Sequence, residues 1–312
     1  MVSNKLPITA IIVVKNESKN LQECIASVQP FVDEILVADT GSTDSTCTML
    51  SETFNINPFH YCLKSEECFS LSSVRNMLIG EAKNKWILTL DADESIDFLN
   101  LNQLRKDLRQ NTHGYFGLWI NKTAGNNIFH DYKLFLFRKS IQMRGLIHGN
   151  VTLDIRSKGL NAAWTNSFEV IHRESKTKNY ATQNFRRQML LRAIELEPNN
   201  ARYYWFLGLT CLDIDKKEEA IKMLKNSLNT ESDFFPIERI NSGIMLTQFC
   251  LQADLTKEAT KNLKTTKNLF DYFKDDIEFA ANPDIEKSIN QLSAILHYEK
   301  EISPLQLKKY SH

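Results

Sequence analysis

The first 170 or so residues alternate short apolar runs with amphipathic stretches. The runs over residues 8–14, 34–38 and 86–90 are dominated by β-branched and other apolar side chains, which is typical of strands buried on both faces of a sheet. Residues 21–28, between the first two runs, carry apolar side chains at helical spacing. This succession of strand, helix and strand predicts an α/β domain with a Rossmann-like, mostly parallel sheet and right-handed crossovers.

Beyond about residue 175 the strand signals end, and apolar residues keep a helical period. The stretch that begins at Ala201 resembles a tetratricopeptide repeat, which is a pair of antiparallel helices. The positions that match the repeat pattern are Pro198, Tyr204, Leu207, Gly208 and Ala220. We therefore predict an α/β domain over residues 1–175 and an all-α helical-repeat domain over residues 176–312, with an ordinary helical hairpin as the alternative for the repeat.

A polar cluster follows each predicted strand, over residues 15–18, 39–44 and 91–94. Ligands of parallel α/β sheets bind outside the carboxyl ends of the strands, so we expect the three clusters to converge on one crevice. Asp91 and Asp93 are two residues apart, and side chains at this spacing in an extended segment point the same way. Both carboxylates can then face one divalent cation that neutralises a diphosphate, whereas a solvated acidic turn is the structural alternative.

Charge and cysteine usage exclude several classes of partner. The chain has 38 basic and 38 acidic residues. It therefore lacks the excess positive charge with which proteins bind the phosphates of nucleic acid. Its apolar runs are far too short for a membrane span, and the N-terminus does not resemble a secretory signal. None of the six cysteines forms a C-x-x-C pair, so we expect reduced thiols and a cytoplasmic location.

Three segments resemble family 2 glycosyltransferases, which have the GT-A fold. The segments are residues 11–18, residues 32–46, and residues 73–76 together with 86–94. Further on, residues 135–138 and 144–148 are similar to a segment of one subgroup that appends tetratricopeptide helices. That subgroup includes lipopolysaccharide-core transferases and the peptide S-glycosyltransferases that modify bacteriocins.

The resemblance implies a metal-dependent, inverting hexosyltransferase that uses Mn²⁺ or Mg²⁺. The donor would be a nucleotide sugar, with UDP-sugar favoured, and the acceptor a cell-surface glycan or its lipid-linked precursor. The same chemistry on a peptide or protein is one alternative, and a catalytically degenerate transferase that serves as a scaffold is another. A nucleotidyltransferase would need a glycine-rich loop after the first strand, and residues 15–18 contain no glycine.

The resemblance also assigns roles to individual positions. Residues that would border the nucleotide are Asn16, Glu17, Asp39, Arg75 and Asp91. Residues that would hold the metal are Asp91, Asp93 and His172. The structural alternatives are that Glu17 only complements a helix dipole and that Arg75 is a surface helix residue.

The general base is where the sequence departs from the family. Relatives carry an acid directly after the histidine that matches His148, and here that position is Gly149. We predict His148 or Asp131 as the base, because an imidazole titrates near neutrality and Asp131 is a nearby carboxylate. Glu169 and Asp154 are further carboxylates in this part of the sequence. A thiol acceptor would relax the need for a base, because a thiol is already partly ionised near neutral pH.

The helical domain is expected to orient the acceptor or to form a homodimer. A lipid-linked acceptor would bring the protein to the inner face of the membrane as a peripheral protein. A groove formed by helical repeats would instead suit a peptide acceptor.

Overall fold

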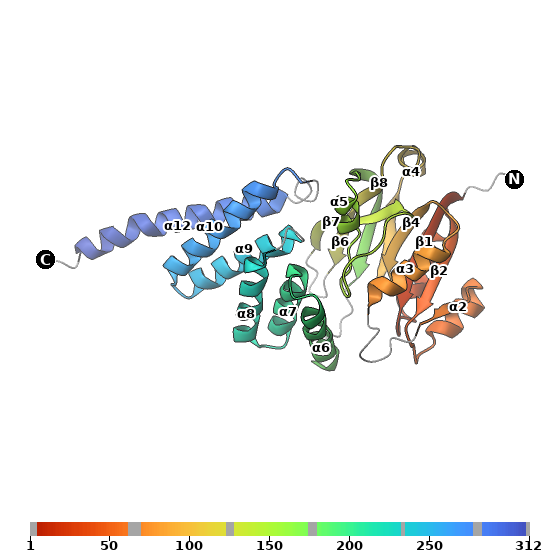
Figure 1. The fold of residues 1–312 in the computed structure, drawn as a ribbon, viewed down its shortest axis with the longest axis horizontal. Coiled ribbons are helices and arrows are strands. Elements are labelled where there is room, and N and C mark those ends of the chain that lie inside the picture. Colours follow the sequence, from red (N-terminus) through yellow and green to blue (C-terminus); the bar gives the residue numbers. More distant parts are fainter. Residues whose placement is uncertain are drawn as a thin grey trace. The chain divides into compact units, whose positions relative to one another are not determined.

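The computed structural model describes residues 5–61, 70–122, 128–173, 180–231, 235–276 and 283–309. The chain divides into two compact units, Met1–Thr177 and Lys178–His312, which are described separately below (Figure 1). This division lies two residues from the predicted seam at residue 175. Among the described residues, no helix combines the length and the apolar content needed to cross a membrane.

The first unit is built on one eight-stranded mixed sheet. Its strands are β1 (Leu6–Val14), β2 (Val32–Asp39), β3 (Phe59–His60), β4 (Trp86–Asp91), β5 (Glu94–Leu99), β6 (Gly114–Lys122), β7 (Ile128–Arg138) and β8 (Ala162–Arg173). They lie in the order β3-β2-β1-β4-β7-β6-β8-β5. Strands β3, β2, β1 and β4 are parallel to one another, as are β6 and β8, whereas β7 is antiparallel to both its neighbours and β5 is antiparallel to β8.

The predicted α/β class is confirmed, and the three apolar runs are the strands β1, β2 and β4 at the parallel end of the sheet. Strand β1 is buried on both faces, and its residues Ile8, Ala10, Ile12 and Val14 share one core cluster with the apolar residues of the helix over Leu21–Val28. The helices of this unit are α1 (Leu21–Val28), α2 (Thr46–Phe54), α3 (Leu71–Glu81), α4 (Leu101–Asp107) and α5 (Thr152–Ser157). Helix α1 buries the apolar positions of the predicted periodic segment, namely Leu21, Cys24, Ile25 and Val28.

The turn after β4 joins two distant parts of the sheet. Strand β4 is paired with β7 only over Trp86–Leu88, and its last residues, up to Asp91, continue beyond this pairing. Strand β5 begins three residues after Asp91 but pairs with β8 at the far edge of the sheet, where Glu94 lies opposite His172. Residues 91–94 therefore connect the parallel strands to a residue of β8 that is far away in the sequence.

The second unit is helical in its described residues, as predicted. Its helices are α6 (Tyr180–Leu196), α7 (Ala201–Asp213), α8 (Lys217–Asn229), α9 (Pro236–Gln252), α10 (Thr256–Phe273) and α12 (Pro283–Lys309). A Cβ atom on Gly208 of α7 would lie 3.0 Å from Leu224 of α8, and one on Gly243 of α9 would collide with Thr266 of α10. The same close approach thus recurs in two successive helix pairs, as a tetratricopeptide-like repeat requires.

Candidate active site

The acidic turn after β4 faces an arginine from α3. Ser70 caps α3 by accepting a hydrogen bond from the backbone N–H of Ser73, which fixes where the helix begins. One turn further on, Arg75 donates to Asp91 Oδ1 at 2.5 Å. Burial raises the pKa of Asp91, but the charges of Arg75 and Lys133, together with the hydrogen bond from Arg75, outweigh this effect and hold the pKa below its usual value. Arg75 and Asp91 therefore form one charged pair at the end of β4.

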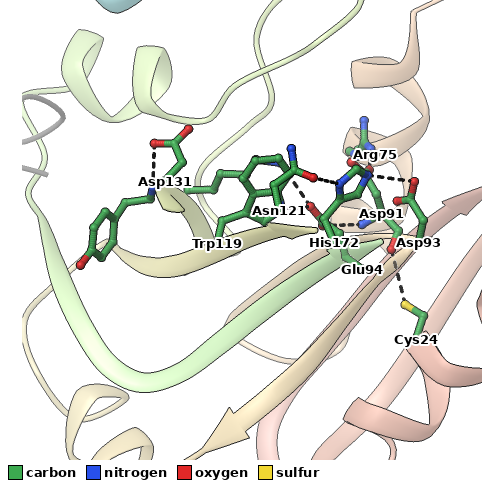
Figure 2. A network of polar contacts seen from close by, with 11 residues as sticks. Cys24, Arg75, Asp91, Asp93, Glu94, Trp119, Asn121, Asp131 and His172 are labelled. Atoms are coloured by element: carbon green, nitrogen blue, oxygen red, sulfur yellow. Dashed lines mark hydrogen bonds and ion pairs between the residues drawn. The ribbon is translucent and has the colours of Figure 1, made fainter. Parts of the chain in front are cut away.

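Asp93 faces His172, which the β5–β8 pairing brings beside it. Asp93 Oδ2 lies 3.2 Å from His172 Nε2, and the Asn121 amide oxygen lies 2.9 Å from His172 Nδ1 (Figure 2). That amide oxygen can only accept, so Nδ1 carries a hydrogen. In a neutral ring, Nε2 then presents a lone pair toward a carboxylate oxygen that also only accepts. The pair needs a proton or a cation between its two atoms.

The raised pKa of His172 is the expected consequence of this arrangement. Burial of the ring lowers its pKa, but the hydrogen bond and the charge of Asp93 raise the pKa by more. A divalent cation between the Asp93 carboxylate and His172 Nε2 would bridge these two acceptors in place of that proton. The hydrogen bond from Nδ1 to Asn121 is also the outer contact that orients metal-binding histidines in proteins.

Glu94 is a buried carboxylate directly behind the turn. It accepts hydrogen bonds from the Trp119 indole at 2.8 Å, from Lys133 Nζ at 3.2 Å and from the backbone N–H of Asp91 at 2.9 Å. Lys133 Nζ lies 3.6 Å above the centre of the Trp119 ring. The Trp119 ring stacks on the His172 ring (Figure 2). Burial raises the pKa of Glu94 more than Lys133 lowers it. Glu94 thus connects the acidic turn to the strands that carry Trp119, Lys133 and His172.

The site holds more negative than positive charge. Glu17, after β1, has a raised pKa because it is partly buried and because it feels the charges of Asp93 and Asp91, although a bond from Asn20 opposes this. Among the described residues, the carboxylates of the site are Glu17, Asp91, Asp93 and Glu94, and the cations bonded to them are Arg75 and Lys133. Oxygen ligands in excess of the local positive charge, with one imidazole among them, suit Mn²⁺ or Mg²⁺.

A second polar cluster is built from the loops after β1 and β2. Asn16 adopts a left-handed backbone conformation, with φ 57°. Its side-chain oxygen accepts from the backbone N–H of Thr43 at 2.7 Å, and its own N–H donates to Ser42 Oγ at 2.8 Å. Asp39 accepts from the N–H groups of Gly41 and Ser42, both at 3.1 Å. The two loops thus form a single hydrogen-bonded surface.

Hydrogen bonds lower the pKa of Asp39 by more than burial raises it. Burial raises the pKa of Asp39, but the bonds from Ser42 and Gly41 bring it below the usual value. Asp44 is held in a similar way by Thr46 and by the N–H of Ser18, and its pKa is about 2 although desolvation opposes the shift. Both side chains are therefore ionised at neutral pH.

The strand register places the two clusters close together. Asp39 of β2 lies beside Val14 of β1, and Asp91 of β4 lies beside Val13. Two strand spacings of roughly 4.8 Å put the backbones of Asp39 and Asp91 about 10 Å apart. The polar clusters after β1, β2 and β4 thus lie at one edge of the sheet.

The two predicted bases occupy different settings. Asp131 of β7 pairs with Trp119 of β6 and accepts from the N–H of its own neighbour, Tyr132, at 2.7 Å. In Figure 2, Trp119 and Asn121 lie between Asp131 and Asp93. His148 belongs to a different segment, the loop after β7, and has a left-handed backbone with φ 51°.

The position after His148 is a point of close packing. A Cβ atom on Gly149 would collide with Ser72 Oγ on α3, so the acid that relatives carry there does not fit this backbone. Ser72 and Arg75 are three residues apart and share one side of α3, so the His148 loop lies near the helix face that carries Arg75. Asp154, in contrast, is fully buried between Arg144 and Lys158 and cannot reach a substrate.

Spacing alone singled out Asp91 and Asp93 but not their partners. Arg75, Asp91, Asp93 and His172 are brought together, whereas Asn16 and Asp39 belong to the neighbouring cluster. The residues that sequence reasoning missed are Glu94, Trp119, Asn121 and Lys133. Glu94 directly follows the acidic pair in the sequence, and that proximity was the only available signal for this group.

Comparisons with known proteins give the family of this domain. The family model described as "Glycosyl transferase family 2" matches residues 9–171. The SPbeta prophage-derived glycosyltransferase SunS of Bacillus subtilis is 28% identical over 238 residues, which cover 73% of this chain and 54% of SunS. The lipopolysaccharide core biosynthesis glycosyltransferase LpsC of Rhizobium meliloti is 29% identical over 94 residues, which cover 30% of this chain and 34% of LpsC.

Among solved structures, the chain resembles the mannosyltransferase PcManGT from Pyrobaculum calidifontis in complex with GDP-Man and Mn²⁺. The identity is 12%, the match covers 85% of each chain, and the TM-score is 0.45. The chain spans about half the length of SunS, which is a longer protein.

Proposed function

The chain belongs to glycosyl transferase family 2, and on that premise we propose that it is a metal-dependent, inverting glycosyltransferase. The donor is a nucleotide sugar, with a UDP-sugar favoured, and the acceptor is a cell-surface glycan or its lipid-linked precursor. The observation that carries the metal dependence is the pair of facing acceptors, Asp93 Oδ2 and His172 Nε2, inside a site with excess carboxylates. A divalent cation would bridge the two acceptor atoms and would also neutralise part of the excess negative charge.

Asp91, Asp93 and His172 would hold the cation. When it is bound, Mn²⁺ or Mg²⁺ supplies a Lewis acid that stabilises the negative charge on the departing diphosphate. Asn121 keeps the His172 ring in the tautomer whose Nε2 is free to act as a ligand. Arg75 lies against Asp91 and can also donate to a phosphate oxygen, because a guanidinium has several donors.

The neighbouring cluster would recognise the nucleoside. Asp39 is ionised at neutral pH, so it can accept hydrogen bonds from a base or a ribose. Asn16 is bonded to Ser42 and Thr43 in this cluster, and the N–H of Glu17, the next residue, donates to Thr46. The spacing of about 10 Å between Asp39 and Asp91, estimated from the sheet geometry, suits a nucleoside at one end and a diphosphate at the other.

Inversion requires in-line attack by a deprotonated acceptor on the anomeric carbon. We propose His148 as the residue that removes the acceptor proton, with Asp131 as the alternative, because the loop of His148 packs beside the helix that carries Arg75. An imidazole can take up a proton near neutral pH. The His148→Gln and Asp131→Asn variants should differ: the variant of the true base loses turnover but keeps donor affinity.

The acceptor class is the least constrained part of the proposal. The partial match to a lipopolysaccharide core transferase favours a glycan. The repeated helix pairs of the second unit favour a peptide, because concave repeat surfaces bind extended segments. With a UDP-sugar donor and a lipid-linked acceptor, the enzyme would work in the cytoplasm at the inner face of the membrane.

The direct test is an incubation of the purified protein with UDP-glucose and Mn²⁺ together with each acceptor class. A mass increase of one hexose identifies the acceptor, and omission of the metal should abolish it. Other UDP-sugars are assayed in parallel, because the structure does not single out glucose. If every donor binds but no sugar is hydrolysed or transferred, the protein is a scaffold and not an enzyme.

A further inference from the structure

Three side chains of different chemistry meet beside the loop after β2. Asp39 ends β2, Cys47 is the second residue of α2, and His60 ends β3. A carboxylate oxygen, the Sγ atom and an imidazole nitrogen of these residues all lie within 4.8 Å of one another. His60 Nδ1 is 3.8 Å from Asp39 Oδ2. The three residues come from three elements, so the fold and not a local sequence motif assembles them.

The surrounding backbone holds these side chains in place. Asp39 and His60 are direct partners in the parallel pairing of β2 with β3, and the N–H of Tyr61 donates to the Asp39 carbonyl at 2.8 Å. The carboxylate of Asp39 is oriented by the N–H groups of Gly41 and Ser42. Such outer hydrogen bonds orient the ligands of metal sites and strengthen binding.

The start of α2 fixes the position of Cys47. Thr46, the residue before it, is tied to Asp44 through both its backbone N–H and its hydroxyl group. Cys47 is only half-buried, and the side chain of His60 is 72% exposed, so an ion can enter from solvent. Closing three ligand atoms that lie within 4.8 Å onto one ion needs only small side-chain movements.

The donor set selects a different metal from the acidic turn. A thiolate, an imidazole and a carboxylate are ligands of Zn²⁺ and Co²⁺, whereas Mg²⁺ and Mn²⁺ prefer oxygen. The thiolate and the carboxylate together neutralise a divalent ion. Binding breaks the S–H bond of Cys47 and releases the proton to solvent, with no change in oxidation state. Three protein ligands leave a fourth position for water.

We propose that Asp39, Cys47 and His60 form a second metal site that binds Zn²⁺. A bound ion occupies the carboxylate that would otherwise accept hydrogen bonds from the nucleoside, so Zn²⁺ competes with the donor nucleotide. The competition rests on the proposed function, but the metal site itself does not. The protein would therefore need one metal for transfer and be inhibited by another.

Titration with Co²⁺ tests the site directly. The protein used for this titration carries Cys62→Ser and Cys68→Ser, so that neither of these two thiols can bind the metal, and excess Mn²⁺ fills the acidic turn. We expect a thiolate-to-cobalt charge-transfer band that disappears on addition of Zn²⁺. Cys47→Ser should abolish the band, and His60→Ala should weaken Co²⁺ binding by at least about tenfold.

Cys250→Ser is the matched control, because Cys250 is also a free, half-buried thiol but lies in α9. The band should persist in this variant. Absence of the band in the parent protein, or its persistence in Cys47→Ser, overturns the proposal. Circular dichroism of each variant establishes that a lost band does not result from unfolding.

Competition with UDP is measured separately by calorimetry in excess Mn²⁺. Zn²⁺ should weaken UDP binding to the parent protein by at least about tenfold and should have a much smaller effect on Cys47→Ser. If the cobalt band is present but UDP does not bind even without Zn²⁺, the proposed function fails while the metal site stands. If UDP binds and Zn²⁺ has the same effect on both proteins, the competition is wrong.

Discussion

The two polar clusters at the carboxyl ends of the parallel strands hold their carboxylates in opposite ways. Asp39 receives hydrogen bonds from the backbone of Gly41 and Ser42, and its pKa is lowered although burial opposes this. Asp93 faces His172 in a site where the pKa of Glu17 is raised. The first cluster is satisfied without a ligand, whereas the second carries negative charge that only a proton or a cation can relieve. The difference separates a cluster whose hydrogen bonds are complete without a bound ion from one that needs a proton or a cation.

Asp93→Asn should have the largest effect, because it removes a charge from the cluster that needs a cation. We expect the rate of sugar transfer to fall by about a thousandfold, since a metal stabilises a leaving diphosphate by several kcal/mol. Initial rates with a UDP-sugar and the acceptor that the incubation experiment identifies measure this loss. The fold should survive, because Asp93 is only half-buried and lies in a turn.

Asp97→Asn is the control for this change. Asp97 lies four residues further on, in β5, and is exposed. Its substitution removes the same charge but should leave the rate within about twofold of the parent, because exposed substitutions away from a site have small effects. Equal losses in the two variants would mean that the acidic turn acts through net charge and not by holding a cation.

Glu94→Ala tests whether the second cluster depends on the buried hydrogen bonds that Glu94 accepts. The change leaves the indole N–H of Trp119, the Lys133 ammonium and the backbone N–H of Asp91 without their common acceptor. We expect the free energy of unfolding to fall by about 2–3 kcal/mol. Glu94→Gln keeps one acceptor oxygen and should lose about half as much. Urea denaturation measures both, and an unchanged midpoint in Glu94→Ala would show that the carboxylate is not structurally required.

The two polar clusters also differ in how much of their structure could be predicted from the sequence. Strands β1, β2 and β4 and helix α1 were predictable because an unbroken apolar run and a helical period each have one structural solution. The polar residues that end β2 and β4 follow from those strands, so Asp39, Asp91 and Asp93 could be placed on one edge of the sheet. These elements are local in the sequence.

The contacts of the acidic turn could not be predicted from spacing. His172 meets Asp93 because β5 crosses to β8, which pairs residues 78 positions apart. Trp119 of β6 and Lys133 of β7 reach Glu94 of β5 because β8 pairs with both β5 and β6, and β6 pairs with β7, an order that the sequence pattern did not reveal. Only the family resemblance pointed to His172 beforehand. The close approach of Gly149 to Ser72 likewise depends on two segments that are distant in the sequence.

Asp39→Asn tests the hydrogen-bonded cluster. The amide retains one acceptor oxygen but turns an N–H₂ group toward the N–H groups of Gly41 or Ser42, so the free energy of unfolding should fall by about 1 kcal/mol. UDP affinity should fall about tenfold, because a bond to a charged acceptor becomes a bond to a neutral one. Asp33→Asn, at the exposed start of β2, is the control: it should leave UDP affinity unchanged, and its effect on stability should be small because it weakens only a surface ion pair with Lys83. Loss of sugar transfer without loss of UDP affinity would instead place Asp39 in the chemical step.

We expect the smallest effect in the pH dependence of the free energy of unfolding. The contribution of the first cluster should be lost as the pH falls, and that of the second cluster as the pH rises. Asp39 and Asp44 have lowered pKa values, so the stability they contribute is present above their ordinary pKa and is lost as the pH falls through the folded value, which is about 2 for Asp44. His172 has a raised pKa, so its contribution is complete below the ordinary value of 6.5 and is lost as the pH rises through the folded value. Glu17 and Glu94 add to this loss at lower pH, because their raised pKa values mean that the folded state resists their ionisation.

Urea midpoints in a metal-free buffer should therefore decrease as the pH rises through neutrality, and His172→Gln should flatten that decrease. Asp44→Asn should lower the midpoint by a constant amount near neutral pH and should change the slope only on the acid limb, because the Asp44 carboxylate is already fully ionised near pH 6. Added Mn²⁺ should reverse the slope of the parent protein around neutrality, because the cation and the proton compete for the space between Asp93 and His172. A slope that Mn²⁺ leaves unchanged would show that the cation binds elsewhere and that Asp93 and His172 are only an ion pair.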